Sequence, residues 1–249
     1  MKKIKYGLIG FGGIAENRIA KEGFGLGLSA GSANSSFELI AAMDINPERA
    51  SAAESLGLKW YKSVEEIIAD DEIEAVFIST NNASHAEIAQ KAILKGKHCL
   101  IEKPIATSIN DAEKLIELAV ENHVSLMVDH MMRENSYNQE AKNLISSGRI
   151  GAVDDIVLHM EFCYGSSEEE AATWRCSKPE ELGGPIGDVG CHCLYMAEFL
   201  LGESITEISC IYTPKTLLIT VENGAIIRFK TEKGIEGTAR VAFNNNRGG

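Results

Sequence analysis

The chain has 249 residues, of which 45% are hydrophobic and 24% are charged, and its formal net charge is −12. This length and composition suit one large globular domain or two smaller ones. The negative charge argues against nucleic acid or an anionic membrane as the main partner. No apolar run approaches the ~20 residues that cross a bilayer. Six irregularly spaced cysteines without a secretory signal favour reduced thiols in the cytoplasm.

The first strongly patterned stretch is an apolar run over residues 4–9 that leads into Gly10-Phe11-Gly12-Gly13-Ile14-Ala15. A Gly-x-Gly-x-x-Ala turn between a strand and a helix is typical of dinucleotide binding. The first glycine allows the tight turn, and the second lets the backbone approach a pyrophosphate. The helix that follows presents its N–H groups and its positive dipole end to the phosphates. Glycines also form ordinary turns, but this placement favours a cofactor site at Gly10, Phe11, Gly12, Gly13 and Ile14.

An acid follows the second apolar run. Residues 37–43 predict a buried strand, and Asp44 stands at its end. An aspartate there can accept hydrogen bonds from both ribose hydroxyls of NAD, and it repels the 2′-phosphate of NADP. The alternative is an aspartate that caps the helix beginning near Pro47. The Gly- and Ser-rich stretch 23–36 lengthens the connection before this strand and predicts a loop insertion near the cofactor. The sequence therefore favours NAD over NADP.

Strand and helix signals alternate along the first half of the chain, which indicates a doubly wound parallel α/β unit. The predicted helices cover residues 47–56, 63–69, 84–95 and 109–122, and the predicted strands cover 58–61, 74–79, 98–102 and 125–129. A helix at 136–147 is then followed by predicted strands at 153–164, 205–212, 217–222, 225–230 and 235–243. Consecutive strands indicate a mostly antiparallel sheet in a second domain. We expect one domain over residues 1–130 and the other over 131–249.

Two places beyond the glycine turn can carry chemistry. Lys103 follows a strand at the edge where α/β sheets bind ligands, so it can stabilise a developing alkoxide; the alternative is a solvated surface lysine before Pro104. Asp188 and His192 lie four residues apart in a predicted helix and share one face. The positive end of that helix disfavours the protonated imidazole and leaves His192 able to accept a proton. The alternative is a capping aspartate with a core histidine.

The Cys191-His192-Cys193 run does not fit a metal site. Helical residues advance by about 100° each, so the two cysteines point to different sides. No matching Cys or His pair lies nearby in the sequence. We expect Cys193, Ala197 and Leu200 to form the buried stripe of this helix.

The order of these features resembles the glucose–fructose oxidoreductase/inositol dehydrogenase/MocA (Gfo/Idh/MocA) family of NAD(P)-dependent oxidoreductases over essentially the whole chain. The resemblance rests on the glycine turn, Asp44, residues 79–85, Glu102-Lys103-Pro104, residues 147–151, Trp174-Arg175 and residues 187–192. The family joins an N-terminal Rossmann domain to a C-terminal α+β domain whose open sheet often mediates oligomerisation. The resemblance therefore implies a dinucleotide-binding domain, a domain for substrate and oligomerisation, and a homo-oligomer.

The resemblance also implies residue roles. Lys103, Asp188 and His192 match the catalytic lysine, aspartate and histidine of the family. The residues that it adds around the cofactor are Thr80, Asn82, His85, Glu102 and Lys103, with His85 expected to pack and cap more than to catalyse, and the residues that it places near substrate are Arg133, Arg175, Asp188 and His192. The implied activity is hydride transfer between NAD(P) and a hydroxyl-bearing carbon of a sugar, polyol or related small molecule. Two alternatives stay open, namely NAD-dependent glycoside cleavage through transient oxidation and a non-catalytic NAD-binding regulator.

Three features depart from the family pattern. Asn81 stands where a proline is common, and Tyr195 stands where many members carry another acid. Family members also usually continue for many tens of residues beyond the position of Gly249. The resemblance therefore predicts that the second sheet is truncated at its C-terminus and exposes an edge.

Overall fold

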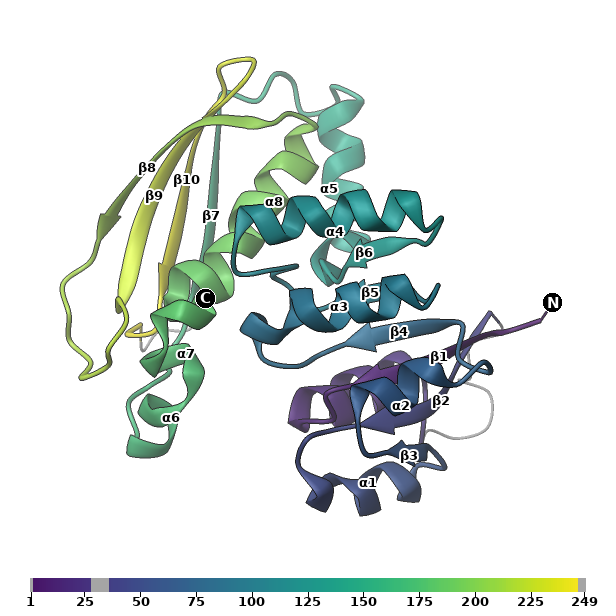
Figure 1. Cartoon of the computed structure of the whole chain (residues 1–249). Coiled ribbons are helices and arrows are strands. Elements are labelled where there is room, and N and C mark those ends of the chain that lie inside the picture. Colours follow the sequence, from purple (N-terminus) through teal and green to yellow (C-terminus); the bar gives the residue numbers. More distant parts are fainter. Residues whose placement is uncertain (1, 28–35, 246–249) are drawn as a thin grey trace. The chain divides into compact units, whose positions relative to one another are not determined.

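The computed structural model describes residues 2–27 and 36–245. The chain folds as two compact units, Met1–Asp129 and His130–Gly249 (Figure 1). Most of the predicted loop insertion falls on residues 28–35, outside the described residues. In the part of the chain that the structure describes, no helix is long and apolar enough to cross a membrane.

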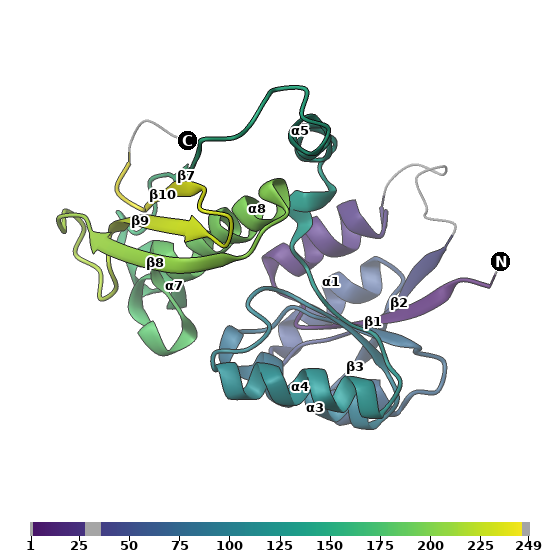
Figure 2. The same cartoon turned by 90° about the horizontal axis from the view of Figure 1, so that it is seen from above.

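The first unit is built on a six-stranded sheet with the order β3-β2-β1-β4-β5-β6, in which all neighbours are parallel. Its strands are β1 (Ile4–Ile9), β2 (Phe37–Met43), β3 (Lys59–Tyr61), β4 (Ala75–Ile78), β5 (His98–Ile101) and β6 (Leu126–Val128). Its helices are η1 (Ala15–Gly23), η2 (Pro47–Arg49), α1 (Ala50–Ser55), α2 (Val64–Ala69), η3 (Asn82–Ser84), α3 (His85–Leu94) and α4 (Ile109–Glu121). Figure 2 shows helices on both sides of this sheet. The predicted doubly wound fold is confirmed.

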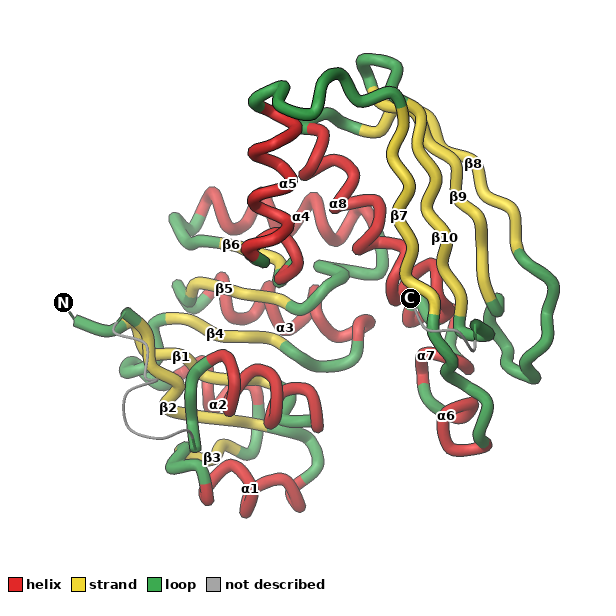
Figure 3. The backbone as a smooth tube through the Cα atoms, turned by 180° about the vertical axis from the view of Figure 1, so that it is seen from behind, coloured by secondary structure: helices red, strands yellow, loops and turns green. Residues whose placement is uncertain are grey.

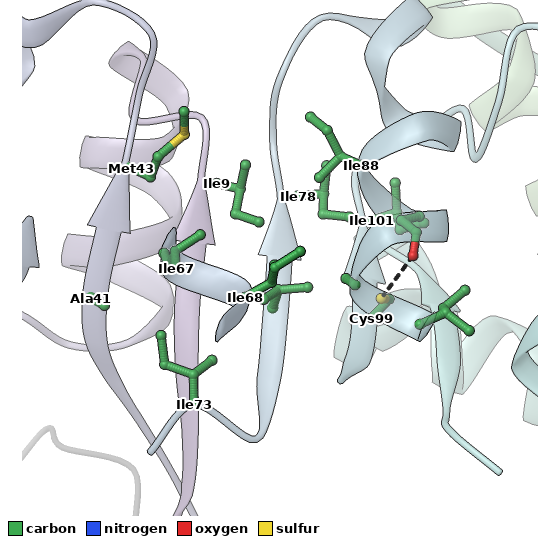
Figure 4. Packing of buried hydrophobic residues seen from close by; sticks show 14 of the residues in the cluster. Ile9, Ala41, Met43, Ile67, Ile68, Ile73, Ile78, Ile88, Cys99 and Ile101 are labelled. Carbon is green, nitrogen blue, oxygen red and sulfur yellow. Dashed lines mark hydrogen bonds between the residues drawn. The ribbon is translucent and has the colours of Figure 1, made fainter. Parts of the chain in front are cut away.

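Burial on both faces explains the continuous apolar strands of this unit. On one face, Ile9 and Ile78 pack against side chains of α2, α3 and α4 (Figure 4). On the other face, Leu8 and Phe77 pack against η1 and α1. Cys99 lies in the first of these cores, where its thiol donates to the Ala89 carbonyl at 4.0 Å and burial raises its pKa to about 12. Because all the strands of this sheet are parallel, they end together at one edge, and the candidate cofactor residues lie at this edge.

The second unit has a four-stranded sheet with the order β7-β10-β9-β8 (Figure 3). Among its neighbouring strands, only the β7–β10 pair is parallel. Its strands are β7 (Asp155–Glu161), β8 (Ile205–Tyr212), β9 (Gly224–Thr231) and β10 (Glu236–Ala242). Its helices are η4 (Met131–Glu134), α5 (Ser136–Ser146), α6 (Glu168–Ala172), α7 (Trp174–Ser177), η5 (Pro179–Glu181), η6 (Ile186–Gly190) and α8 (Cys191–Leu201). Helix α8 ends at Gly202 in the left-handed conformation, and it buries Cys193 and Ala197 against the sheet. The mostly antiparallel α+β unit is confirmed.

The buried stripe of α8 differs in one residue from the prediction. Cys193 and Ala197 are buried as expected, whereas Leu200 is half-buried and Met196 is buried. Burial raises the pKa of the Cys193 thiol to about 11, so this cysteine behaves as an apolar core residue.

The predicted strand at residues 217–222 is wrong, because this segment is a loop. Its backbone donors bond outside any sheet: Thr220 N donates to the Cys176 carbonyl at 3.0 Å, and Leu217 N donates to Asn223 Oδ1 at 2.6 Å. The apolar residues that suggested a strand are buried instead beside Cys176, in a small separate core. A loop that is held by hydrogen bonds can thus bury an apolar run without forming a strand.

Candidate functional site

The glycine turn lies directly after β1. Gly10 has a φ of +89°, and a Cβ added there would lie 2.5 Å from the carbonyl oxygen of Ser79. At Gly12 and Gly13 an added Cβ would meet nothing within 4 Å, and both residues are exposed. The turn therefore requires glycine at its first position for protein packing and leaves open space at the later ones. That space, at the start of a helix, fits the close backbone approach of a dinucleotide pyrophosphate.

Asp44 is fixed against this turn by two backbone hydrogen bonds. Its Oδ2 accepts from Phe11 N at 2.6 Å, and its Oδ1 accepts from Asn46 N at 2.8 Å. The cap of η2 is Asn46, whose side chain accepts from Glu48 N at 3.0 Å. Asp44 is therefore not the capping residue of this helix. Each carboxylate oxygen keeps lone-pair capacity beyond these bonds, so Asp44 can still accept from ribose hydroxyls.

Arg49 and Glu16 complete the turn, and the sequence reasoning missed both. Arg49 Nε donates to the Phe11 carbonyl at 2.7 Å, and its Nη2 pairs with Glu16 at 2.5 Å. Glu16 also pairs with Lys21 at 2.7 Å, and these two cations lower its pKa. Glu16 thus pairs with both cations beside the turn and offsets one of their two positive charges. Nothing in the sequence spacing brings Arg49 to Glu16, since the contact depends on how η2 follows β2.

The loops after β4 and β5 bring further predicted residues to the same edge of the sheet. His85 is fully buried, and its ring nitrogens lie 2.8 and 3.2 Å from the carbonyl oxygens of Pro104 and Thr80. It therefore ties one loop to the other, which suits its expected packing role. Asn82 is buried at 5% exposure, while Thr80 is half-buried.

Glu102 and Lys103 follow β5 at the same edge and are both half-buried. Lys103 N donates to Glu102 Oε2 at 3.2 Å. Because parallel strands point the same way, Lys103, Asp44 and the glycine turn all belong to the carboxyl edge of one sheet. The predicted cofactor residues of the first unit thus follow strands β1, β2, β4 and β5 at one edge of the sheet, with the side chain of Phe11 buried in the core.

In the second unit, Asp188 and His192 lie on one continuous helical segment. Helix η6 passes into α8 through Gly190, whose φ of −63° and ψ of −36° are helical. Asp188 is 7% exposed, and its Oδ2 accepts from Arg175 Nε at 3.3 Å. The structure therefore joins two of the predicted residues, Asp188 and Arg175, in a largely buried ion pair.

One sequence argument about His192 is wrong. The helical segment begins at Ile186, so His192 comes in its second turn and not in its first. The positive end of a helix acts within the first turn, and it therefore does not account for a neutral His192. The residue at that end is Glu222, whose Oε1 accepts from Ile186 N at 3.0 Å. Sequence reasoning missed Glu222 because it placed this residue in a strand.

Within the second unit, a series of aromatic and cationic side chains begins at His192. The His130 ring stacks on Tyr195 with centroids 4.1 Å apart, and it meets the His192 ring edge-on at 6.1 Å. Arg133, which the sequence placed near substrate, is exposed, and its guanidinium hydrogen-bonds Tyr195. His130 was not predicted as a site residue, because no local motif marks it.

The cysteines of α8 have separate environments. Cys193 is buried, whereas Cys191 is half-buried and its thiol donates to the Asp188 carbonyl at 3.5 Å. Among residues 2–27 and 36–245, no three His, Cys, Asp or Glu side chains gather in a group that could hold a metal ion.

Two family descriptions match the chain. Residues 4–130 match "Oxidoreductase family, NAD-binding Rossmann fold", and residues 138–249 match "GFO/IDH/MocA C-terminal domain". The two matched ranges correspond to the two units described above and together cover most of the chain.

Individual relatives are similar over much of the chain. A 1,5-anhydro-D-fructose reductase of Ensifer adhaerens is 33% identical over 68% of this chain and 51% of its own length. A glucose-6-phosphate 3-dehydrogenase of Bacillus subtilis is 31% identical over 83% of this chain and 56% of its own. The chain thus spans about half the length of these curated relatives. The crystal structure of an aldose-aldose oxidoreductase from Caulobacter crescentus, 24% identical, covers 98% of this chain and 72% of its own, with a TM-score of 0.86. This last likeness shows a shared fold.

Proposed function

The chain belongs to the Gfo/Idh/MocA family of oxidoreductases, and on that premise we propose that it transfers hydride between NAD and a hydroxyl-bearing carbon of a sugar or polyol. The observation that carries this proposal is the turn after β1. It is open at Gly12 and Gly13, and Asp44 is fixed beside it at 2.6 Å from Phe11 N. A turn shaped only for packing has no need of glycine where an added Cβ meets nothing.

The residues of the turn suit NAD more than NADP. The backbone N–H groups at the start of η1 would bind the pyrophosphate, and Asp44 would accept from the ribose hydroxyls. The carboxylate of Asp44 would repel a 2′-phosphate, and Arg49 is already paired with Glu16. Bound NAD supplies a nicotinamide ring that accepts the hydride. Around it we propose the predicted contacts from the loops after β4 and β5, which are Thr80, Asn82, His85 (through its bond to Thr80), Glu102 and Lys103.

Three side chains would handle the substrate hydroxyl. His192 accepts its proton at Nε2, because Nδ1 of the same ring is buried. Lys103 donates a hydrogen bond from Nζ to the substrate oxygen and stabilises the negative charge that develops there. Asp188 would orient the His192 imidazole from the preceding helical turn, where Arg175 holds its carboxylate. Arg175 and Arg133 provide the proposed further contacts to substrate.

The test replaces Lys103 with methionine and assays turnover with NAD on a panel of sugars, polyols and hydroxy acids. Loss of one charge-stabilising donor should lower kcat by about 100-fold or more. The Kd for NADH should change much less than kcat, because Lys103 is one of several proposed cofactor contacts while the turn and Asp44 are untouched. Lys114→Met, on the exposed surface of α4, is the matched control and should behave as the parent. Unchanged turnover in Lys103→Met would refute the assignment.

We also propose a cytoplasmic homo-oligomer. All six cysteines are free thiols, which suits a reducing compartment. One face of the second sheet packs on α8, while Val157 and Ile211 on the other face are 61% and 65% exposed. We propose this exposed sheet face as the contact between copies, as the family resemblance implies. Light scattering that gives the mass of a single chain at micromolar concentration would contradict the oligomer.

A further inference from the structure

A ladder of rings and cations links α8 to the segment that begins the second unit. His192, Tyr195 and Phe199 occupy positions i, i+3 and i+7 of α8 and therefore share one face of the helix. They face His130, which lies just before η4, and Arg133, which lies in η4. These five residues, called the ring ladder below, include the proposed proton acceptor at one end.

The His130 ring touches both of its aromatic neighbours in favourable geometry. It stacks on Tyr195 with an interplanar angle of 13° and a centroid distance of 4.1 Å. It meets His192 at 89° with a centroid distance of 6.1 Å. Stacked and edge-to-face contacts are the preferred arrangements of aromatic rings. His130 is therefore a flat wall whose plane is set by Tyr195 and whose position limits rotation of the His192 ring.

The other end of the ring ladder holds Tyr195 in place. The Tyr195 hydroxyl hydrogen-bonds Arg133, and this contact is the first cause of the raised pKa of Arg133. The Arg133 guanidinium also lies 5.6 Å from the ring centroid of Phe199. Lys142 of α5 lies over the same ring at 4.4 Å and donates to the Phe199 carbonyl. Tyr195 is thus held both by its face and by its hydroxyl group.

We propose that His130 is a positioning residue for His192, with Tyr195 as its support. The lone pair of an imidazole nitrogen lies in the plane of the ring, so rotation about the Cβ–Cγ bond turns it away from the hydroxyl proton. A wall that limits this rotation keeps the nitrogen aligned, and alignment of reacting groups contributes strongly to rate. This inference rests on the proposed function only for the role of His192 as proton acceptor. The ring arrangement itself can be measured without turnover.

The kinetic test compares two replacements of His130. His130→Phe keeps a flat ring without nitrogen atoms, whereas His130→Ala removes the wall. We expect kcat to fall about tenfold in His130→Ala, with the KM for substrate within about twofold, and His130→Phe to restore most of the loss. Equal losses in both variants would overturn the proposal, because the imidazole nitrogens and not the flat ring would then matter.

The second readout is the NMR signal of the His192 ring protons, assigned by its absence in His192→Gln. A neighbouring aromatic ring shifts such signals, so we expect a clear change in His130→Ala and a signal close to that of the parent in His130→Phe. If His130→Ala does not fold, as judged by circular dichroism, His130→Leu keeps a similar volume without a flat ring and should give the same change. An unmoved His192 signal would overturn the proposal. If the His192 signal moves in His130→Ala but the parent protein has no dehydrogenase activity, the ring arrangement is supported and the proposed function is refuted.

Discussion

A pair of alanine substitutions in the turn after β1 separates packing from cofactor binding. Gly10→Ala places a side chain at a φ of +89°, in the left-handed region, which costs about 1–2 kcal/mol. Its Cβ would also lie 2.5 Å from Ser79 O and 2.7 Å from Ser79 C. These backbone atoms follow a strand with parallel neighbours on both sides, so relieving the contact adds about 1–3 kcal/mol. The free energy of unfolding should therefore fall by about 2–5 kcal/mol.

Gly12→Ala should have the opposite pattern. Its φ is not in the left-handed region, and the added Cβ meets nothing within 4 Å. A compatible Gly→Ala change stabilises a protein by about 0.4–1 kcal/mol. The Cβ would, however, fill the space proposed for the pyrophosphate. We expect the Kd for NADH to rise at least about tenfold, which corresponds to ~1.4 kcal/mol.

The assay combines urea unfolding with calorimetric titration of NADH. Of the two tryptophans, Trp60 belongs to the sheet that carries the turn, so a Trp174→Phe background isolates the fluorescence of that unit. Two results would refute the reasoning. One is unchanged NADH affinity in Gly12→Ala, and the other is a Gly10→Ala protein as stable as its parent.

Two further predictions follow from fixed carboxylates. Asp44→Asn keeps an acceptor for the turn but removes the charge, so the ratio of the Kd values for NADPH and NADH should fall about tenfold; a parent protein that binds both equally would contradict this. The pKa of Asp70 is lowered from 3.8, chiefly by the Tyr61 hydroxyl and then by Glu72 N and Lys59. A lowered folded-state pKa stabilises the fold above the unfolded-state pKa, and this stabilisation is lost as pH falls through the folded-state value. Asp70→Asn should therefore have a lower free energy of unfolding than the parent at pH 7, and the gap between the two free energies should narrow below about pH 4. A gap in the free energy of urea unfolding that stays constant from pH 7 to pH 3 would contradict this.

The sequence predicted the first sheet well because its signals are local. Strands buried on both faces, such as β1 and β4, are continuous apolar runs between polar turns. The segment at 217–222 has the same signal but is held as a loop by the Asn223 side chain and the Cys176 carbonyl. The short helices α6 and α7 were not predicted, although the capping box of Ser167 and Glu170 is a readable start signal.

In the candidate site, too, some residues could be predicted from the sequence and others could not. The glycine turn and Asp44 could be predicted, because a fixed spacing of residue types places them at the ends of neighbouring strands. The partners of these residues could not, since they depend on packing between distant elements. Arg49 reaches Glu16, Arg175 reaches Asp188, and His130 reaches Tyr195. No spacing rule within one helix or strand contains such contacts.

Isotope transfer tests the central claim most directly. The chain is supplied with NAD and with sugars and polyols that carry deuterium on their hydroxyl-bearing carbons, and the reduced cofactor is analysed by mass spectrometry. The proposed direct transfer predicts that reduced NAD gains the deuterium in ordinary water. Reduced NAD without the label, or no reduced NAD from any member of the panel while NADH binds, would contradict it.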